Sequence, residues 1–255
     1  MATRIATLVK AREDGTKKIV DMRRSGINAL AQTEERIVLP RGSDLVRDVL
    51  DLVQIHGTDV ELFTADFQDA FLNLVITEEE RGHAIVLMKQ GHFGAYKGVP
   101  FGLATAPLLW GRAAAFIGRC TQAVQARDQR RLQIYVDDPA IVVGGRRTQR
   151  TWLLGRTLIL WAMLGAKVAL HKVGRGQSVK WIGALYEIRP GGLEVSIDAE
   201  RIKKLKQVVQ QGLAAKGLIT GARSLAGELS WVAGIIPTSR PFVNMIWAAV
   251  YELAR

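Results

Sequence analysis

Two acidic segments of this sequence have residue types and spacing suited to metal-assisted chemistry. The first is Tyr135-Val136-Asp137-Asp138, which lies between two apolar runs. The second begins at Asp66, directly after another apolar run. Magnesium prefers oxygen ligands, so three carboxylates brought together could hold two divalent cations. Two such ions about 4 Å apart can clamp the attacking and leaving oxygens of an in-line phosphoryl transfer.

The elements around these acids are expected to place them at strand ends. Residues 132–136 and 140–143 predict the two strands of a hairpin with both acids at its tip, and Pro139 opens the return strand, where proline is tolerated. Residues 60–66 predict another strand, which ends at Asp66. Aspartate is also an ordinary turn residue, so the acidic pair alone could be merely structural. The second acidic strand end favours a site.

The order of the other elements predicts an α+β fold, because strands mixed with helices come first and a helical lobe follows. Ser43 is expected to cap a helix that Gly57 ends, and Thr105 to cap a long helix with Pro107 in its first turn. The remaining expected elements are strands at 18–22, 85–88, 94–96 and 179–188, helices at 148–164 and 220–236, and helices that begin at Asp198 and Ser239.

Composition limits the class of protein. The chain has 255 residues, a formal net charge of +11 and a hydrophobic fraction of 48%, which excludes a mainly disordered chain. Its pI of about 10.1 favours nucleic acid as a partner, although a basic surface can also serve solubility alone. Basic clusters at 127–131, 146–150 and 201–206 could likewise be phosphate tracks or solvated faces.

The chain is expected to be intracellular, in the cytoplasm or the nucleus, and to work without a membrane. It has one cysteine, Cys120, so no disulfide framework can form within it. The longest uncharged apolar stretch, 157–166, is about half the length that a bilayer span needs.

Several segments, in this order, carry a resemblance to a known family. They are F-T-A-D-F-Q-D-A-F (63–71), G-V-P-F-G-L-A-T-A-P (98–107) and I-Y-V-D-D (134–138). They resemble the reverse transcriptases of retroelements, of the long-terminal-repeat and tyrosine-recombinase retrotransposon types. The segment 14–23, with Asn28 beyond it, looks like the family's fingers. The segments 167–172 and 181–183 look like the two motifs after its catalytic hairpin. The segments 225–229 and 237–242 look like its thumb or connection region.

The resemblance implies a right-hand polymerase, in which an antiparallel palm sheet with packed helices joins fingers and thumb. We therefore expect fingers at 1–57, a palm at 58–190 with a second fingers part at about 77–98, and a helical thumb or connection lobe at 191–255. The implied activity is that of an RNA-directed DNA polymerase, a nucleotidyltransferase that uses two Mg²⁺ ions, or Mn²⁺ in their place. Implied partners are an RNA or DNA template with its primer, deoxynucleoside triphosphates, and other polyprotein domains such as ribonuclease H.

The family's site residues transfer position by position. Asp66, Asp137 and Asp138 match the catalytic, metal-binding triad, and Asp137 is the best single catalytic candidate. Phe71 matches the aromatic residue that excludes a ribose 2′-hydroxyl, although it could be a plain core aromatic. The other matches concern the incoming nucleotide: backbone at Phe67 and Gln68, the pocket loop at Phe101 and Gly102, a fingers cation at Lys17 near Lys10 and Arg12, and Lys172 near the lysine proposed to protonate pyrophosphate.

Two other functions compete with this interpretation. A catalytically dead, nucleic-acid-binding remnant of a retroelement polyprotein would keep the basic charge. Pro139 in place of the usual aliphatic residue, and the lack of a ribonuclease H set of acids, favour the remnant slightly. An unrelated metal-dependent phosphatase or nuclease would use the acids but would not explain the pocket loop. The complete triad and Phe71 favour an active polymerase.

Overall fold

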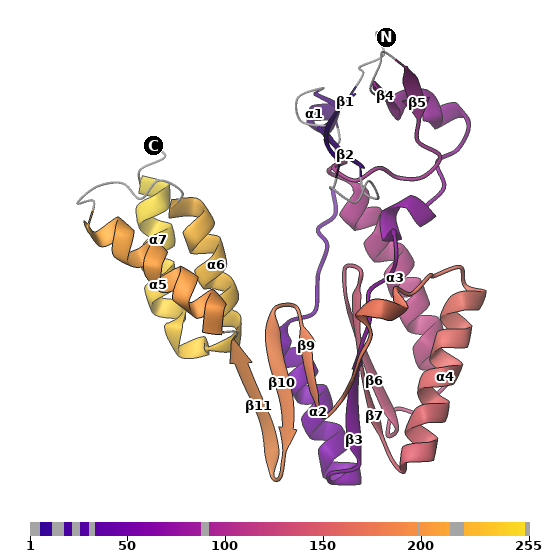
Figure 1. Ribbon diagram of the computed structural model, residues 1–255, viewed down its shortest axis with the longest axis vertical. Helices are drawn as coiled ribbons and strands as arrows, with labels where there is room; N and C mark the ends of the chain where they lie inside the picture. The colour runs from indigo at the N-terminus through magenta and orange to yellow at the C-terminus, as the bar shows by residue number, and fades with distance from the viewer. Residues whose placement is uncertain are drawn as a thin grey trace.

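The computed structural model describes residues 6–11, 18–21, 26–30, 34–87, 92–197, 199–214 and 222–252. Helices and largely antiparallel sheets are mixed, which confirms the expected α+β class. Three regions can be followed in Figure 1: a small sheet near the N-terminus, a central sheet between helices, and a second small sheet that leads to C-terminal helices.

The N-terminal sheet has the strand order β2-β1-β4-β5. Its β1–β4 pair is parallel and its other pairs are antiparallel. Because β4 and β5 lie far along the chain from β1, this sheet joins two separate segments of sequence. Its elements are β1 (Ala6–Ala11), β2 (Lys18–Asp21), β4 (Ile85–Leu87) and β5 (Phe93–Ala95), with the short helices α1 (Ile27–Leu30), η1 (Ala70–Asn73) and η2 (Glu79–His83) nearby in sequence.

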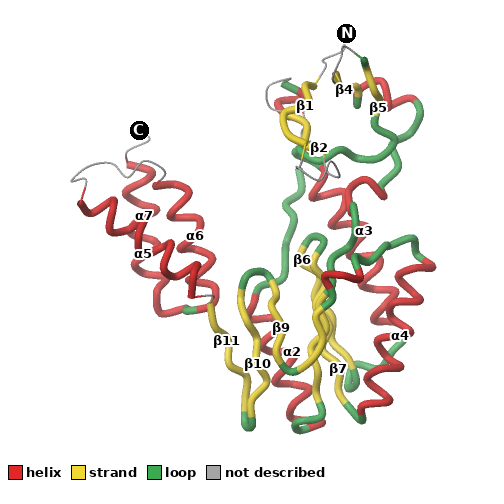
Figure 2. The backbone as a smooth tube through the Cα atoms, in the orientation of Figure 1, coloured by secondary structure: helices red, strands yellow, loops and turns green. Residues whose placement is uncertain are grey.

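The central sheet is antiparallel, with the strand order β6-β7-β3-β8. As Figure 2 shows, helices lie on both sides of it. Side-chain clusters place α2 against one face and α3 and α4 against the other. The elements are β3 (Val60–Thr64), β6 (Arg130–Tyr135), β7 (Asp138–Gly144), β8 (Gly174–Gly176), α2 (Gly42–His56), α3 (Ala106–Ala123), α4 (Arg147–Met163) and η4 (Leu170–Lys172).

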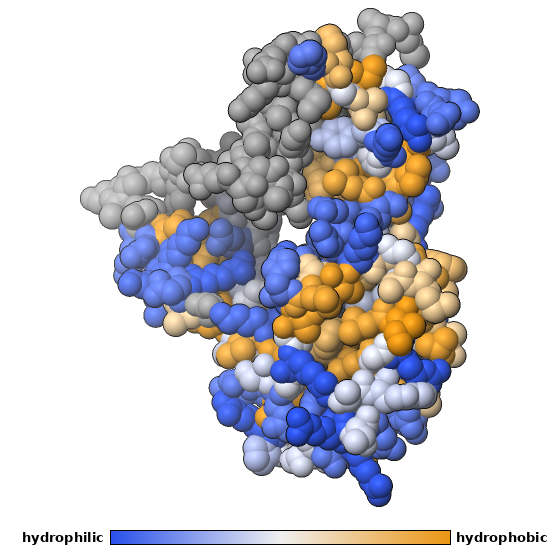
Figure 3. Space-filling view, turned by 45° about the vertical axis from the view of Figure 1, so that its right-hand side comes forward, coloured by the Kyte–Doolittle hydropathy of each residue, from blue (hydrophilic) through white to orange (hydrophobic). Residues whose placement is uncertain are grey.

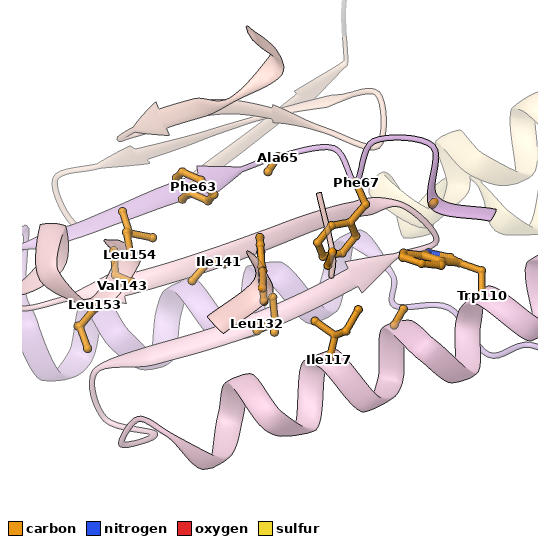
Figure 4. Packing of buried hydrophobic residues seen from close by; sticks show 14 residues of the cluster. Phe63, Ala65, Phe67, Trp110, Ile117, Leu132, Ile141, Val143, Leu153 and Leu154 are labelled. Carbon is orange, nitrogen blue, oxygen red and sulfur yellow. The ribbon is translucent and has the colours of Figure 1, made fainter. Parts of the chain in front are cut away.

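Helices on both faces explain why the two inner strands are apolar almost without interruption. Successive side chains of a strand point to opposite faces, so a strand buried on both sides lacks polar alternation. Phe63 and Ile141 pack in the cluster on the α3–α4 face, drawn in Figure 4, whereas Leu62 and Val142 pack in the cluster on the α2 face. The two clusters together hold β3 and β7 rigidly, and these are the strands that lead to the acids.

The structure corrects one predicted strand. Residues 179–188 form two antiparallel strands with a turn at Ile182 and Gly183, whose φ angles are 42° and 87°. The apolar run continues through the turn, so the sequence pattern alone did not reveal it. A third strand, which the sequence analysis missed, completes the sheet β11-β10-β9. Its elements are β9 (Ser178–Trp181), β10 (Ala184–Arg189) and β11 (Gly192–Ile197).

Helix α2 begins earlier than predicted. Its N-cap is Arg41 and not Ser43, because the Asp44 carboxylate accepts a 2.7 Å hydrogen bond from the Arg41 amide. The predicted end at Gly57 is confirmed, with a φ of 60° that favours glycine. Thr105 immediately precedes α3, also as predicted.

The C-terminal region consists of helices α5 (Ala199–Ala214), α6 (Ala222–Ile235) and α7 (Arg240–Glu252), with the short η5 (Pro237–Ser239). The predicted cap at Asp198 lies outside the described residues.

Apolar side chains are exposed on the α3–α4 side of the central sheet. Figure 3 shows hydrophobic surface there, and Phe116, Ile159 and Met163 are exposed. Within the described residues, no helix combines the length and the apolar character that crossing a membrane requires.

Candidate active site

The central sheet brings the two acidic segments to one of its ends. Thr64, the last residue of β3, pairs with Ala140 of β7, so Asp66 follows β3 beside the tip of the β6–β7 hairpin. Two backbone bonds continue the pairing beyond the strand: Ala65 N donates to Pro139 O at 3.1 Å, and Phe67 N donates to Asp137 O at 2.8 Å. Asp137 lies in the turn of the hairpin, and Asp138 is the first residue of β7.

Asp66 and Asp138 line one small hollow of about 220 Å³. Lys172 of η4 lines it too, and its ammonium donates a hydrogen bond to a carboxylate oxygen of Asp66. The Asp66 side chain is 16% exposed and that of Lys172 is 49% exposed, so this ion pair lies at the mouth of the hollow. The other lining residues are Thr64, Ala65, Lys180, Trp181, Ile182 and Gly183.

Asp138 is electrostatically coupled to both of the other acids. Burial, together with the negative charges of Asp137 and Asp66, raises its pKa to about 6, and Lys172 opposes the rise. The two neighbouring carboxylates therefore make it harder for Asp138 to be charged. A divalent cation would relieve that repulsion, so the chemistry of this donor set fits Mg²⁺.

The carboxylates nevertheless do not form a finished metal site. Nowhere in the described part of the chain do three or more His, Cys, Asp or Glu side chains converge as a set that could hold an ion. In addition, the ammonium group of Lys172 already pairs with Asp66, one of the three acids. The metal roles of Asp66, Asp137 and Asp138 stay predictions, and binding would require Asp66 to exchange its partner.

The predicted nucleotide pocket places two aromatic rings together. Phe71 in η1 and Phe101 in the 98–105 loop contact each other edge to face, with ring centroids 5.1 Å apart. The loop is fixed by Asn28, whose amide donates to Gly102 O at 2.9 Å and whose side-chain oxygen accepts from Ala104 N at 2.8 Å. This bonding gives Asn28 a structural task that the sequence analysis did not foresee.

Glycine is required at the start of that loop. A Cβ on Gly98 would lie 2.1 Å from the carbonyl oxygen of Leu72, so no larger residue fits without moving backbone. Gly98 also forms an isolated antiparallel bridge with Val75. The 98–105 loop is therefore held close to the segment that follows Phe71.

Phe67 and Gln68 are tied into the structure through their backbone. Besides the bond from Phe67 N to Asp137, Gln68 N donates to Lys167 O at 2.8 Å. The Phe67 ring is buried against Trp110 and Trp161. Both amides thus have partners within the protein, and contact of this backbone with a triphosphate stays a prediction. Lys17 and Arg12 lie outside the described residues, and only the backbone of Lys10 is described.

Two of the predicted basic clusters have members that are buried within the protein. Arg150 is buried and pairs with Glu61 at 3.1 Å and Asp59 at 3.4 Å. Arg130 is also buried and donates to the carbonyl of Thr121 near the end of α3. Burial lowers the pKa of Arg130 to about 10, with a contribution from the neighbouring Arg156. Both arginines are thus held by contacts within the protein, and phosphate contacts by the other members of the clusters stay a prediction.

Two tryptophans contact the acidic turn, and the sequence analysis missed this role. Trp110 Nε1 donates to Val136 O at 2.6 Å, and Trp181 Nε1 donates to Asp138 O at 2.9 Å. Both side chains are buried, as expected for core aromatics. These hydrogen bonds join residues that are far apart in the sequence, and no local sequence pattern predicts them.

Comparison with known proteins supports the fold. No family model matches the chain, and no curated protein matches it. Among solved structures, the foamy viral protease-reverse transcriptase in complex with double-stranded DNA matches with a TM-score of 0.64, 13% identity and 97% of this chain. A second structure of that protein with double-stranded DNA gives a TM-score of 0.59, 14% identity and 89% coverage. Its complex with an RNA/DNA hybrid gives a TM-score of 0.55, 14% identity and 75% coverage of this chain.

These matches concern only part of the viral protein. The chain spans 39%, 42% and 23% of the three solved chains, respectively. At such low identity the likeness concerns the path of the backbone and not the site residues. The chain thus has a reverse-transcriptase-like fold.

Proposed function

We propose that this chain is an RNA-directed DNA polymerase. The observation that carries the proposal is the meeting of two acidic segments at one hollow within a reverse-transcriptase-like fold. In this assignment residues 58–190, with the central sheet, α3 and α4, form the palm, residues 1–57 and about 77–98, with the N-terminal sheet, form the fingers, and residues 191–255 form the thumb or connection lobe. Helix α2 lies within 1–57 in the sequence but packs against the central sheet.

Asp66, Asp137 and Asp138 would hold the two divalent cations. Mg²⁺ held there would activate a primer 3′-hydroxyl and offset the charge of the departing pyrophosphate. The protein's share is placement, because phosphoryl transfer depends on position and electrostatics more than on a nucleophilic side chain. Rigid packing of β3 and β7 on both faces serves this placement.

The nucleotide would lie against the Phe71 ring. The edge-to-face contact with Phe101 restricts the position of the Phe71 ring. The Phe71 ring would then exclude a ribose 2′-hydroxyl and so select deoxynucleotides. The backbone near Phe67 and Gln68, the Phe101-Gly102 loop, and Lys17 are the proposed triphosphate contacts. Lys172 would leave Asp66 when metal binds, which would free its ammonium for the pyrophosphate.

The proposed macromolecular partner is a template-primer duplex. The structural neighbours were solved with an RNA/DNA hybrid and with double-stranded DNA, and the net charge of +11 suits a polyanion. Mainly electrostatic contacts predict binding that is independent of sequence and weakens with salt.

A catalytically dead, nucleic-acid-binding remnant is the second candidate. The pairing of Lys172 with Asp66 favours it, since a decayed site could keep this ion pair permanently. It would share the fold and the affinity for nucleic acid, and it would lack only turnover.

Primer extension separates the two candidates. The assay uses an oligo(dT)-primed RNA template, deoxynucleotides and Mg²⁺, with Asp137→Ala as the matched variant and a low-salt gel shift as the binding control. Extension by the wild type alone, with equal binding by both proteins, supports the polymerase. Binding without extension by either protein supports the remnant.

A further inference from the structure

The turn that carries the acids has an unfavourable backbone conformation. Val136, between Tyr135 and Asp137, has a φ of 54°, in the left-handed region that β-branched residues rarely adopt. A residue persists in such a conformation only when its surroundings hold it there. The turn should therefore have specific bonds that keep it in place.

Four consecutive carbonyl groups of this turn each accept a hydrogen bond. Those of Asp137 and Pro139 accept from the backbone beyond β3, as described above. Those of Val136 and Asp138 accept from indole N–H groups, at 2.6 Å from Trp110 and at 2.9 Å from Trp181. Backbone and indole donors thus alternate along the turn.

The two indoles reach the turn from opposite faces of the sheet. Trp110, on α3, belongs to the cluster on the α3–α4 face and lies beside Phe67 in Figure 4. Trp181, on β9, belongs to the cluster on the α2 face. Their exposed fractions are 2% and 3%, so water has little access to either side chain. A buried indole N–H is only a donor, and leaving it unpaired is costly.

We propose that Trp110 and Trp181 are positioning residues, which fix the backbone on both sides of Asp137 so that the acids face a shared cation. The inference rests on the proposed function and adds two residues that act through the backbone of the turn. It assigns the effect to the indole N–H and not to the bulk of the ring. Through its hydrogen bond, Trp110 also links α3 to the placement of the acids. Trp181 links the β9–β10 hairpin to it in the same way.

The test replaces each tryptophan by phenylalanine and uses Trp161→Phe as the matched control. Trp161 is fully buried, contacts the same Phe67 ring, and donates its indole N–H to Thr121 Oγ1 at 2.9 Å, away from the turn. The three variants therefore lose a comparable ring and a comparable hydrogen bond. Where phenylalanine prevents folding, benzothienylalanine at 110 or 181 keeps the ring shape and lacks the N–H.

Two measurements are made below the unfolding temperature of every variant: kcat and KM for single-nucleotide addition, and the Kd for Mn²⁺ by calorimetry without nucleic acid. We expect Trp110→Phe and Trp181→Phe to lower kcat by roughly ten- to a hundredfold with KM little changed, and to weaken Mn²⁺ binding. Trp161→Phe should match the wild type in both. Equal behaviour of all three variants would overturn the inference.

The Mn²⁺ measurement keeps this inference separate from the proposed function. If the wild type binds Mn²⁺ but adds no nucleotide, the polymerase proposal fails, and weaker Mn²⁺ binding by the two turn variants still supports the positioning role. If the wild type adds nucleotides and the two turn variants do so equally well, only the positioning role fails. If the wild type neither binds Mn²⁺ nor adds nucleotides, both fail.

Discussion

Replacing Lys172 by glutamine should tighten the binding of Mg²⁺ to the chain. The ammonium of Lys172 neutralises Asp66, so a cation that uses this carboxylate must first displace it. With 49% of the Lys172 side chain exposed, water screens the pair, and a contribution of about 0.5–1 kcal/mol is appropriate. Removing that competition corresponds to a Kd for Mg²⁺ lower by a factor of about 2–5.

An opposing effect determines the conditions of the assay. Lys172 also lowers the pKa of Asp138, so its removal favours the protonated acid, which binds metal poorly. At pH 8, well above the Asp138 pKa of about 6, that carboxylate is mostly charged and the displacement effect dominates.

Calorimetric titration with Mg²⁺, without nucleic acid, measures the effect. Lys167→Gln is the matched control, because it removes the same charge from an exposed lysine in the connection between α4 and η4, five residues before Lys172. We expect tighter binding by Lys172→Gln and no comparable change in Lys167→Gln. Unchanged or weaker binding by Lys172→Gln would refute the argument that Lys172 and the metal compete for Asp66.

Three further substitutions test other parts of the account. Phe71→Val should raise the ratio of ribonucleotide to deoxynucleotide incorporation by roughly tenfold or more, measured by single-nucleotide addition, and an unchanged ratio would remove Phe71 from the pocket. Burial raises the pKa of Asp48, partly offset by a 2.7 Å hydrogen bond from Gln133, so folding favours its protonated form. The Asp48 contribution to stability is thus greatest below about pH 3.8 and falls as the pH rises. In denaturant titrations, Asp48→Asn should therefore gain stability relative to the wild type toward pH 7. A difference in the free energy of unfolding between the two proteins that stays constant with pH would contradict this. Tyr186→Phe should raise the free energy of unfolding by about 1 kcal/mol, because the buried Tyr186 hydroxyl has no hydrogen-bond partner among the residues that the structure describes. It should also reduce the cost of Gly42→Ala, whose Cβ would lie 2.6 Å from that hydroxyl, and an unchanged cost would refute the contact.

Local signals in the sequence predicted much of the fold. The acidic hairpin, the strand before Asp66 and the end of α2 at Gly57 each depend on a few neighbouring residues, and the structure contains all of them. The turn at Ile182 was missed because it interrupts an apolar run with no polar residue to mark it. The N-cap of α2 at Arg41 was missed because the cap uses the Asp44 side chain and not the more typical Ser43.

The site was predictable as a set of residues but not as an arrangement. Order along the chain identified Asp66, Asp137 and Asp138, since strand ends of one sheet tend to meet. The pairing of Lys172 with Asp66 and the indole bonds to the turn depend on tertiary contacts between residues far apart in sequence. No periodicity or spacing encodes such contacts, so only the structure could reveal them.

The most direct test of the central claim is single-deoxynucleotide addition to an RNA-templated primer by variants of the two acidic segments. Asp66→Asn and Asp137→Asn keep the side-chain size and remove one charge each. Asp69→Asn is the matched control, since Asp69 has a φ of 51° that asparagine tolerates well. The account predicts addition by the wild type and Asp69→Asn and none by the other two. A wild type without activity, or an Asp66→Asn variant with the wild-type rate, would contradict it.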